Sequence, residues 1–445
     1  MIFKKFYINL IFLFSVLLAG CAGPGNYQVE LLPSPHVYSE GLVHPFPKEN
    51  PRLSKLAYNG ILYVTDREPS DNKHEEVYYR NERGYELRLG KGEIEIDRLS
   101  LAVKRDISWE ELVNVSKQKV RNQAYPLQVH NFREYGFLSS TKILASKEQK
   151  NSKEFHQAEN IFADLIDQKL ALSKKKDIYI YVHGYRTIFE DPLLVGASFW
   201  HYMGYDGVFI AYAWPATPRT FAYLGDLDTA KMTTRNLRLF IHYLSTKTNV
   251  ENIHIIGYSM GTRVVTDTLH DISLINVNKT HQQIHKDYRI GNVMLIGSDL
   301  ERGVFGSYLM DGLLRVPKTL TVYTSSSDSA VGFSSWLFER YRLGESWGDY
   351  VPKQRFINFM KKNNNLRFID VTGAQDSATG NGHHYFTESP WVSSDLLLSL
   401  IYDLPPQSRG LVFNKKYQTW AFPKDYDKQV SAAVQKIDPV IRGIK

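Results

Sequence analysis

Residues 257–261 read Gly-Tyr-Ser-Met-Gly, and this short segment restricts the fold of the chain more than any other feature. Residues 253–256 before it are apolar except for His254, as in a buried strand, and residues 262–271 after it have helical periodicity. Glycines two positions before and after a serine permit a sharp strand-to-helix turn that exposes the serine oxygen. We therefore interpret Ser259 as a candidate nucleophile.

Short apolar runs alternate with helical patterns through most of the chain. The apolar runs are rich in β-branched and aromatic residues and cover 178–182, 208–214, 253–256, 293–296, 320–323 and 366–371. Helical patterns cover 154–172, 228–247 and 262–271, and Ser108 begins a capping pattern for another helix. This alternation predicts an α/β fold, with a mostly parallel central sheet and helices on both faces. Earlier runs at 60–65, 85–89 and 92–96 predict an antiparallel edge on the same sheet.

A serine hydroxyl is a weak nucleophile unless a neighbouring base removes its proton. After a turn of this type the chain order is serine, acid, histidine, and the histidine follows the last strand. We expect residues 366–371 to form that strand, and the loop after it contains the adjacent His383 and His384. We favour His383 as the base and keep His384 as the alternative.

Two aspartates are candidates for the acid that orients the base. Asp328 follows the run at 320–323, and Asp299 follows the run at 293–296. Because the acid normally follows the penultimate strand, strand counting favours Asp328. We expect Asp299 to cap a helix or to serve as a structural partner.

Acyl transfer also requires backbone N–H groups that stabilise a developing oxyanion. Met260 directly follows the candidate nucleophile and supplies one N–H. We assign the second to Tyr185, because His183-Gly184 before it ends the first buried strand and allows close backbone approach. We expect His183 to brace this loop rather than to act as a base.

The N-terminus has the features of a bacterial lipoprotein signal. Lys4 and Lys5 precede an apolar stretch at 8–18, which is too short to span a membrane comfortably. The small residues before Cys21 resemble a lipobox, so we expect cleavage before Cys21 and acylation of its thiol. Ala22 after the cysteine is typical of outer-membrane sorting in Gram-negative cells. We therefore expect a lipid anchor in the cell envelope, on the periplasmic side.

These features divide the chain into five parts. We expect a signal peptide at 1–20, a tether and surface arm at 21–55, N-terminal strands with a helix at 56–150, a catalytic core at 151–405 and a C-terminal extension at 406–445. The single cysteine excludes an intramolecular disulfide. The formal charge of +7 is scattered, which is not the pattern of a nucleic-acid-binding surface.

No motif for a metal or a cofactor is present in the sequence. His74-Glu75-Glu76 lacks the second histidine of a zinc-binding helix, since residue 78 is tyrosine. Gly90 and Gly92 are not followed by the third glycine of a dinucleotide-binding loop, since residue 95 is glutamate. We expect neither a metal nor a cofactor.

Taken together, the motifs resemble a bacterial family of α/β hydrolases long classed as a domain of unknown function. The resemblance extends from about Ile61 to Leu404, and its landmarks are Tyr63-Val64-Thr65-Asp66-Arg67, Val182-His183-Gly184-Tyr185, Trp214-Pro215, Tyr223 with Asp226, Gly257-Tyr258-Ser259-Met260-Gly261, Val322-Tyr323 with Asp328, Arg342-Leu343-Gly344, Ile369-Asp370-Val371 and Gly382-His383 with Tyr385. It implies an α/β-hydrolase fold and a triad of Ser259, Asp328 and His383. It implies no particular substrate.

The expected activity is hydrolysis of a carboxylic ester through an acyl-enzyme, on a small-molecule or lipid ester in the envelope. The alternative is an envelope binding or scaffold lipoprotein that uses a hydrolase fold without turnover, since a fold does not establish a function. Labelling of Ser259 by a fluorophosphonate distinguishes the two.

Overall fold

The structure is a computed structural model. It describes residues 29–50, 60–70, 78–96, 107–142, 144, 146, 152–219, 222–338, 340–347 and 353–437. The predicted signal peptide and Cys21 lie outside these residues.

The described residues form one mixed sheet of 11 strands. Its order is β10 (Val412–Asn414), β11 (Thr419–Ala421), β9 (Leu366–Asp370), β8 (Thr319–Thr324), β7 (Ile290–Ile296), β6 (Asn252–Tyr258), β4 (Asp177–Val182), β5 (Val208–Tyr212), β1 (Ile61–Pro69), β2 (Tyr79–Ile96) and β3 (Leu127–Phe137). Neighbouring strands are parallel from β11 across to β1, and antiparallel pairs lie at both margins. The predicted parallel sheet with an N-terminal antiparallel edge is confirmed.

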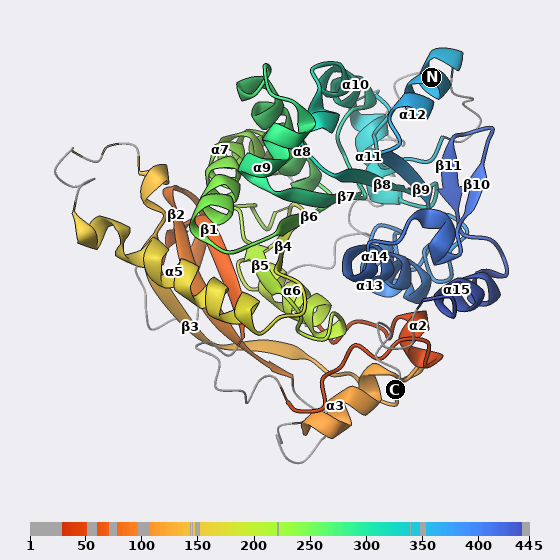
Figure 1. Cartoon of the computed structure of the whole chain (residues 1–445), viewed down its shortest axis with the longest axis horizontal. Helices are drawn as coiled ribbons and strands as arrows, with labels where there is room; N and C mark the ends of the chain where they lie inside the picture. The colour runs from red at the N-terminus through yellow and green to blue at the C-terminus, as the bar shows by residue number, and fades with distance from the viewer. Residues whose placement is uncertain are drawn as a thin grey trace, which may run out of the picture.

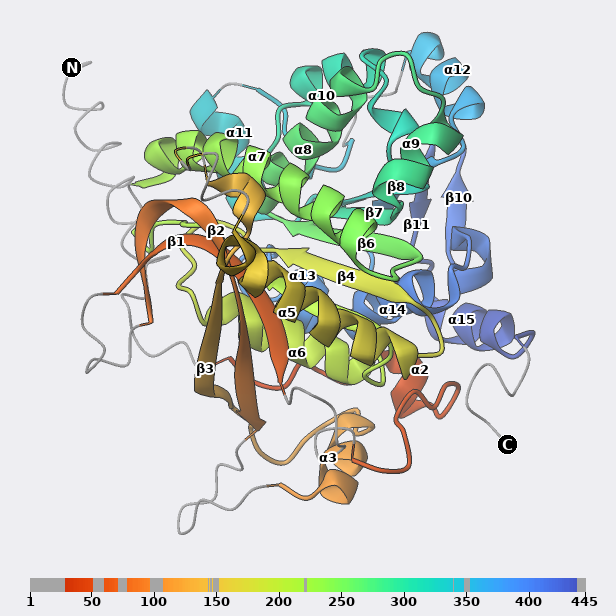
Figure 2. The same cartoon turned by 60° about the vertical axis from the view of Figure 1, so that its left-hand side comes forward.

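Helices cover both faces of the sheet (Figures 1 and 2). Above the sheet in Figure 1 lie α7 (Tyr223–Lys247), α8 (Gly261–Ile275), α9 (His281–Tyr288) and α10 (Arg302–Met310). Below it lie α6 (Asp191–Tyr202), α13 (Tyr385–Glu388) and α14 (Pro390–Tyr402). The central strands β4 to β8 are therefore buried on both sides, which explains their continuous apolar sequences.

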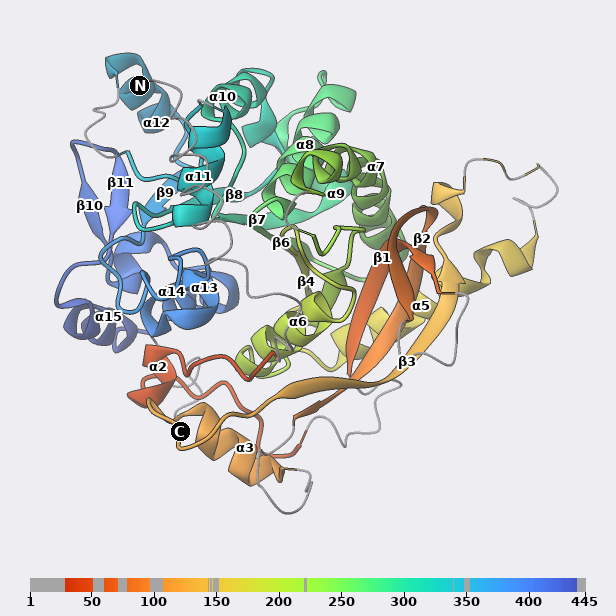
Figure 3. The ribbon, with the colours of Figure 1, turned by 180° about the vertical axis from the view of Figure 1, so that it is seen from behind.

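The predicted helix boundaries agree with the capping contacts. Ser152 accepts a hydrogen bond from the Phe155 N–H and begins α5 (Lys153–Ala171). Ser108 accepts one from the Glu111 N–H and begins α3 (Trp109–Ser116), as its sequence pattern predicts. Helix α11 (Ser329–Phe338) follows β8 in the chain, and α12 (Gln354–Lys362) precedes β9, as the view from behind shows (Figure 3).

The N-terminal margin differs from the sequence prediction in one respect. The runs at 85–89 and 92–96 belong to one continuous strand, β2, rather than to two strands. Gly90 and Gly92 do not make a turn between them. A Cβ atom at residue 90 would lie 2.3 Å from the Tyr63 hydroxyl oxygen, so glycine is required there by close packing.

The C-terminal margin also differs, because β9 is not the last strand. Residues 406–437 add the hairpin of β10 and β11 and the helix α15 (Tyr426–Val434). Strand β11 pairs with β9 in parallel and extends the sheet. These short strands carry no strong apolar run, and β10 is exposed along its length, so their sequence gave little signal.

Residues 29–50, which fall in the predicted surface arm, pack on the body of the protein. The short helix α2 (His36–Ser39) contacts α14, and Val37 and Val43 are fully buried. The Tyr38 hydroxyl donates a hydrogen bond to the Tyr202 carbonyl oxygen over 2.6 Å. The proline and glycine content of this segment predicts a surface arm and does not reveal these isolated apolar contacts.

Candidate active site

Ser259 lies on a tight turn between β6 and α8. Its φ angle is +50°, a left-handed conformation that is uncommon for residues other than glycine and occurs at strained functional turns. A Cβ atom at residue 261 would lie 2.3 Å from the carbonyl oxygens of Val182 and His183, so the second glycine of the motif is required sterically. The Ser259 residue is 9% exposed, at the edge where the parallel strands end.

His383 and Asp328 come together at this edge. His383 Nδ1 lies 2.7 Å from Asp328 Oδ2, and both residues are almost completely buried. The second oxygen of Asp328 accepts a hydrogen bond from the Val331 N–H over 3.0 Å, which fixes the carboxylate at the start of α11. A carboxylate held in this way can orient an imidazole and stabilise its protonated form.

The Asp328–His383 pair is close to the nucleophile turn. The Tyr258 ring lies 4.9 Å from the His383 ring between centroids, and the Ser259 N–H donates to the Ile296 carbonyl oxygen. Gly297 follows Ile296 in the chain, and a Cβ atom added to Gly297 would lie 2.9 Å from His383 Cε1. Among the described residues, no hydrogen bond joins the Ser259 hydroxyl to either candidate histidine. Hydrogen bonds of this kind are often long in unliganded enzymes and shorten when substrate binds.

The alternative histidine has a different partner. His384 Nδ1 lies 3.2 Å from the Tyr258 hydroxyl and forms no ion pair with Asp328 among the described residues. Burial, together with the neighbouring His383, lowers the pKa of the His384 imidazole to about 4. The structure thus pairs His383, and not His384, with the candidate acid.

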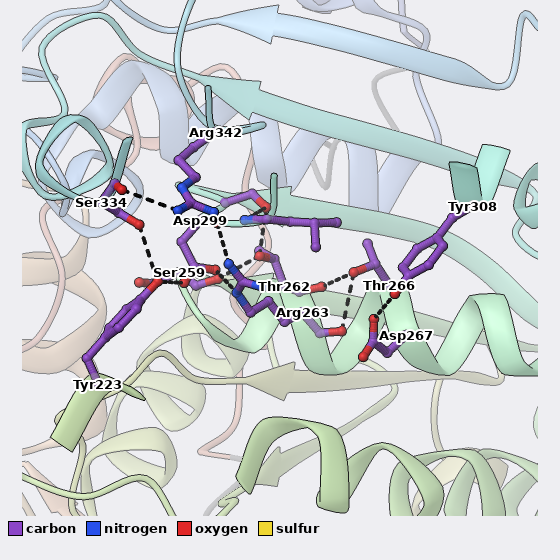
Figure 4. Close-up of polar contacts among 12 residues, drawn as sticks. Tyr223, Ser259, Thr262, Arg263, Thr266, Asp267, Asp299, Tyr308, Ser334 and Arg342 are labelled. Atoms are coloured by element: carbon purple, nitrogen blue, oxygen red, sulfur yellow. Dashed lines mark hydrogen bonds and ion pairs between the residues drawn. The ribbon is translucent and has the colours of Figure 1, made fainter. Parts of the chain in front are cut away.

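The alternative acid, Asp299, lies near the nucleophile turn in a polar cluster with Tyr223, Arg263 and Arg342 (Figure 4). Its Oδ1 atom accepts a hydrogen bond from Arg263 Nε over 3.0 Å, and its Oδ2 atom accepts one from the Tyr223 hydroxyl over 2.5 Å. Arg342 donates to the Asp299 carbonyl oxygen. Both carboxylate oxygens of Asp299 are thus engaged by Arg263 and Tyr223, and Glu301 is the residue that caps α10.

The loop after β4 contacts the nucleophile directly. A Cβ atom at Gly184 would lie 2.9 Å from Ser259 Cβ and 3.4 Å from its Oγ, so only a glycine fits against the serine here. Tyr185 follows in the same loop, and its ring packs at 89° on the Tyr223 ring. Met260 is the N-cap residue of α8, where the first N–H groups have no acceptor within the helix. Met260 thus follows Ser259 directly, and Tyr185 follows the glycine that packs against Ser259.

His183 braces this loop. Its ring stacks on Trp214 at 10°, and the Trp214 Nε1–H donates to the His183 carbonyl oxygen over 2.7 Å. Its Nε2 atom lies 3.1 Å from the Trp214 carbonyl oxygen. Burial, together with the charge of Arg67, lowers the pKa of the imidazole to about 3. Burial thus disfavours the protonated form of this ring, and its contacts connect the loop to Trp214.

Two residues near the site were not assigned a role from the sequence. Position 258 is variable in the sequence motif, but the Tyr258 ring contacts the rings of both His383 and His384. The sequence pattern includes Arg67 without giving it a function. In the structure Arg67 donates to the carbonyl oxygen of Thr187, two residues after the candidate oxyanion donor Tyr185. The charged pair Asp66-Arg67, soon after the apolar run at 61–64, was the available signal for the second residue.

A helix-covered parallel sheet that carries a serine on a strand-to-helix turn defines an α/β hydrolase fold. The chain belongs to the family of alpha/beta hydrolases of unknown function, DUF900, whose model matches residues 158–400. The match begins after β3, so the Tyr63–Arg67 landmark lies outside it.

Two solved structures are similar to this chain. Esterase B from Lactobacillus rhamnosis has 11% identity and a TM-score of 0.28, and the match covers 49% of this chain and 70% of that chain. A lipase-esterase related protein from Clostridium acetobutylicum has 12% identity and a TM-score of 0.26, and the match covers 52% of this chain and 96% of that chain. Among curated proteins, no sequence matches this chain.

Within the described ranges, no group of histidine, cysteine and acidic side chains could hold a metal ion. No helix in the same ranges is both long and apolar enough to cross a membrane.

Proposed function

We propose that the protein is a serine hydrolase that cleaves carboxylic esters through an acyl-enzyme. The observation that carries this proposal is the meeting of three separate segments at one edge of the sheet. These are the left-handed turn at Ser259, the 2.7 Å contact between His383 and Asp328, and the Gly184 loop against the serine. Membership of an α/β hydrolase family supports the same chemistry.

In the proposed mechanism Ser259 Oγ attacks the ester carbonyl carbon, and His383 Nε2 takes the hydroxyl proton. The N–H groups of Met260 and Tyr185 stabilise the oxyanion. The C–O bond to the leaving group then breaks, and His383 returns the proton to the departing alcohol. Water, activated by the same imidazole, attacks the acyl-enzyme, so that the carboxylic acid leaves and Ser259 is regenerated. Asp328 orients the ring and balances its charge in both steps.

A fluorophosphonate probe tests this proposal, because it reacts covalently with activated serines. We expect the wild-type protein to be labelled and Ser259→Ala to lose all labelling. Ser273→Ala is a matched control, since Ser273 is buried at the far end of the same helix. Folded wild-type protein that takes no label would contradict the proposal and would favour the scaffold alternative.

We further propose that a lipid on Cys21 anchors the protein to an envelope membrane, on the periplasmic side of the outer membrane in a Gram-negative host. An anchored enzyme of this kind would act on lipid esters or on acylated envelope components. The support is the charged, apolar and small-residue pattern of residues 4–21. Two or more acyl chains hold a protein stably at a bilayer. Cys21→Ala is expected to move the protein from the membrane to the soluble fraction, and full membrane retention would contradict the anchor.

A further inference from the structure

Arg67 is a fully buried arginine at the end of the strand β1. Its Nη1 group donates to Asn81 Oδ1 over 2.5 Å, and its Nη2 group donates to the Thr187 carbonyl oxygen over 2.7 Å. Within the described part of the chain, no carboxylate lies within ion-pair distance of this guanidinium, and its Nε atom has no hydrogen-bond partner. The direct contacts of this charge are therefore with neutral acceptors. Carboxylates act on it only from farther away, namely those of Glu190, Asp66, Asp191 and Asp226.

Burying an arginine without a carboxylate in direct contact is expected to lower the stability of the folded protein. Burial of a charge is unfavourable unless a close partner of opposite charge compensates it, and apolar replacements of buried charges are often neutral or stabilising. The buried Arg409 shows the usual compensation, since its Nε donates to Asp395 Oδ1 over 2.7 Å. Arg67 lacks such a contact, so its position needs another explanation.

The explanation lies in the segment that Arg67 holds. The Thr187 hydroxyl donates to the carbonyl oxygens of Gly184 and Tyr185, each over 3.2 Å. Arg186 between them has a φ angle of +59°, which an arginine adopts only when its surroundings impose it. The Arg67 contact with Thr187 therefore fixes a strained loop whose Gly184 lies against Ser259.

We propose that Arg67 is a positioning residue that holds the loop at 184–187 in the conformation needed for the oxyanion donor at Tyr185. This inference rests on the proposed serine hydrolase activity. It also assigns a role to the N-terminal strands, because Arg67 and Asn81 belong to β1 and β2, outside the matched family range. Stabilisation of an oxyanion depends steeply on the position of the donors.

The test compares Arg67→Met and Arg67→Lys with the control Arg409→Met. Arg67→Met keeps much of the length of the side chain and removes direct contacts only to neutral acceptors, so we expect it to fold. We expect its kcat for p-nitrophenyl butyrate to fall by about tenfold or more, with KM within about twofold of the wild type. Arg67→Lys should recover part of this loss, because one ammonium group can reach one of the two acceptors. Arg409→Met leaves Asp395 unpaired, so it should lower stability and spare kcat.

Hydrogen exchange of the peptide that covers residues 183–190 gives a readout independent of activity. We expect faster exchange there in Arg67→Met than in the wild type, and no change there in Arg409→Met. Wild-type kcat together with wild-type exchange in Arg67→Met would overturn the inference. A wild-type protein that is inactive and unlabelled would instead overturn the proposed function, and the exchange comparison would still decide whether Arg67 holds the loop.

Discussion

The carboxylate of Asp328 lies 2.7 Å from Nδ1 of His383, although 55 positions separate the two residues in the chain. Asp328 follows β8 and His383 lies in the loop after β9, so the parallel pairing of these strands brings them to the same edge. The contact fixes which ring nitrogen faces the acid. The other nitrogen, Nε2, is then the one available for proton transfer.

The first prediction concerns the acid. Asp328→Asn keeps the shape of the side chain but favours the wrong tautomer of His383, so kcat should fall by about 10⁴-fold. Asp299→Asn is the matched control. It removes the charge that pairs with Arg263, so we expect a loss of stability of about 1–2 kcal/mol and much higher activity than in Asp328→Asn. Equal losses of kcat in the two variants would contradict the assignment of the acid.

The second prediction concerns the two adjacent histidines. His383→Ala should reduce kcat for a p-nitrophenyl ester by at least about 10²-fold, because general acid–base catalysis contributes 10²–10⁴-fold. His384→Ala should retain most activity, since that ring contacts the Tyr258 hydroxyl and not Asp328. If His384→Ala were inactive and His383→Ala active, the assignment of the base would be wrong.

The third prediction concerns the close approach of the Gly184 loop to the nucleophile. In Gly184→Ala the new Cβ atom would stand 2.9 Å from Ser259 Cβ, so the serine or the loop must shift. We expect kcat/KM to fall by about tenfold or more, because small displacements of reacting groups are costly. Gly306→Ala is the control, since no atom lies within 4 Å of its added Cβ. An unchanged kcat/KM in Gly184→Ala would exclude a tight contact.

The fourth prediction concerns stability in acid. Burial lowers the pKa of His183 from 6.5 to about 3, so between these values the unfolded chain binds a proton that the folded protein does not. This residue therefore lowers the free energy of unfolding as the pH falls below 6.5. From pH 7 to pH 5 the contribution is about 2 kcal/mol.

The measurement is the free energy of unfolding by urea at pH 7 and pH 5, for the wild type and for His183→Gln. The variant should show a smaller loss between the two pH values. An identical pH dependence in both proteins would mean that His183 titrates normally in the folded state.

Much of the fold was predictable because its signals are local. Each central strand is buried on both faces and is therefore a continuous apolar run, and the turn at Ser259 requires glycines at fixed positions. The alternation of strands and helices then leaves few arrangements other than a parallel sheet. The margins were less predictable. The sequence does not reveal that Gly90 packs against the Tyr63 ring within a continuous β2, and the β10–β11 hairpin is too short and exposed to leave a pattern.

For the candidate site, the order of the motifs along the chain predicts which residues are candidates but not how they contact one another. Chain order placed Asp328 and His383 among the candidates, and their contact required the tertiary structure. Their catalytic roles, and those of Ser259, Tyr185 and Met260, stay predictions. The contact of Arg67 with the loop after β4 could not be located from the sequence, because its acceptor is a backbone carbonyl 120 positions away.

The most direct test of the account is the mass of the protein during turnover of an activated ester. Rapid mixing with excess p-nitrophenyl acetate, acid quenching and peptide mapping should find one acetyl group on the peptide that contains Ser259. Asp328→Asn should form the same adduct more slowly, and Ser259→Ala should form none. Ester turnover without any adduct on Ser259, or turnover that persists in Ser259→Ala, would contradict the central claim.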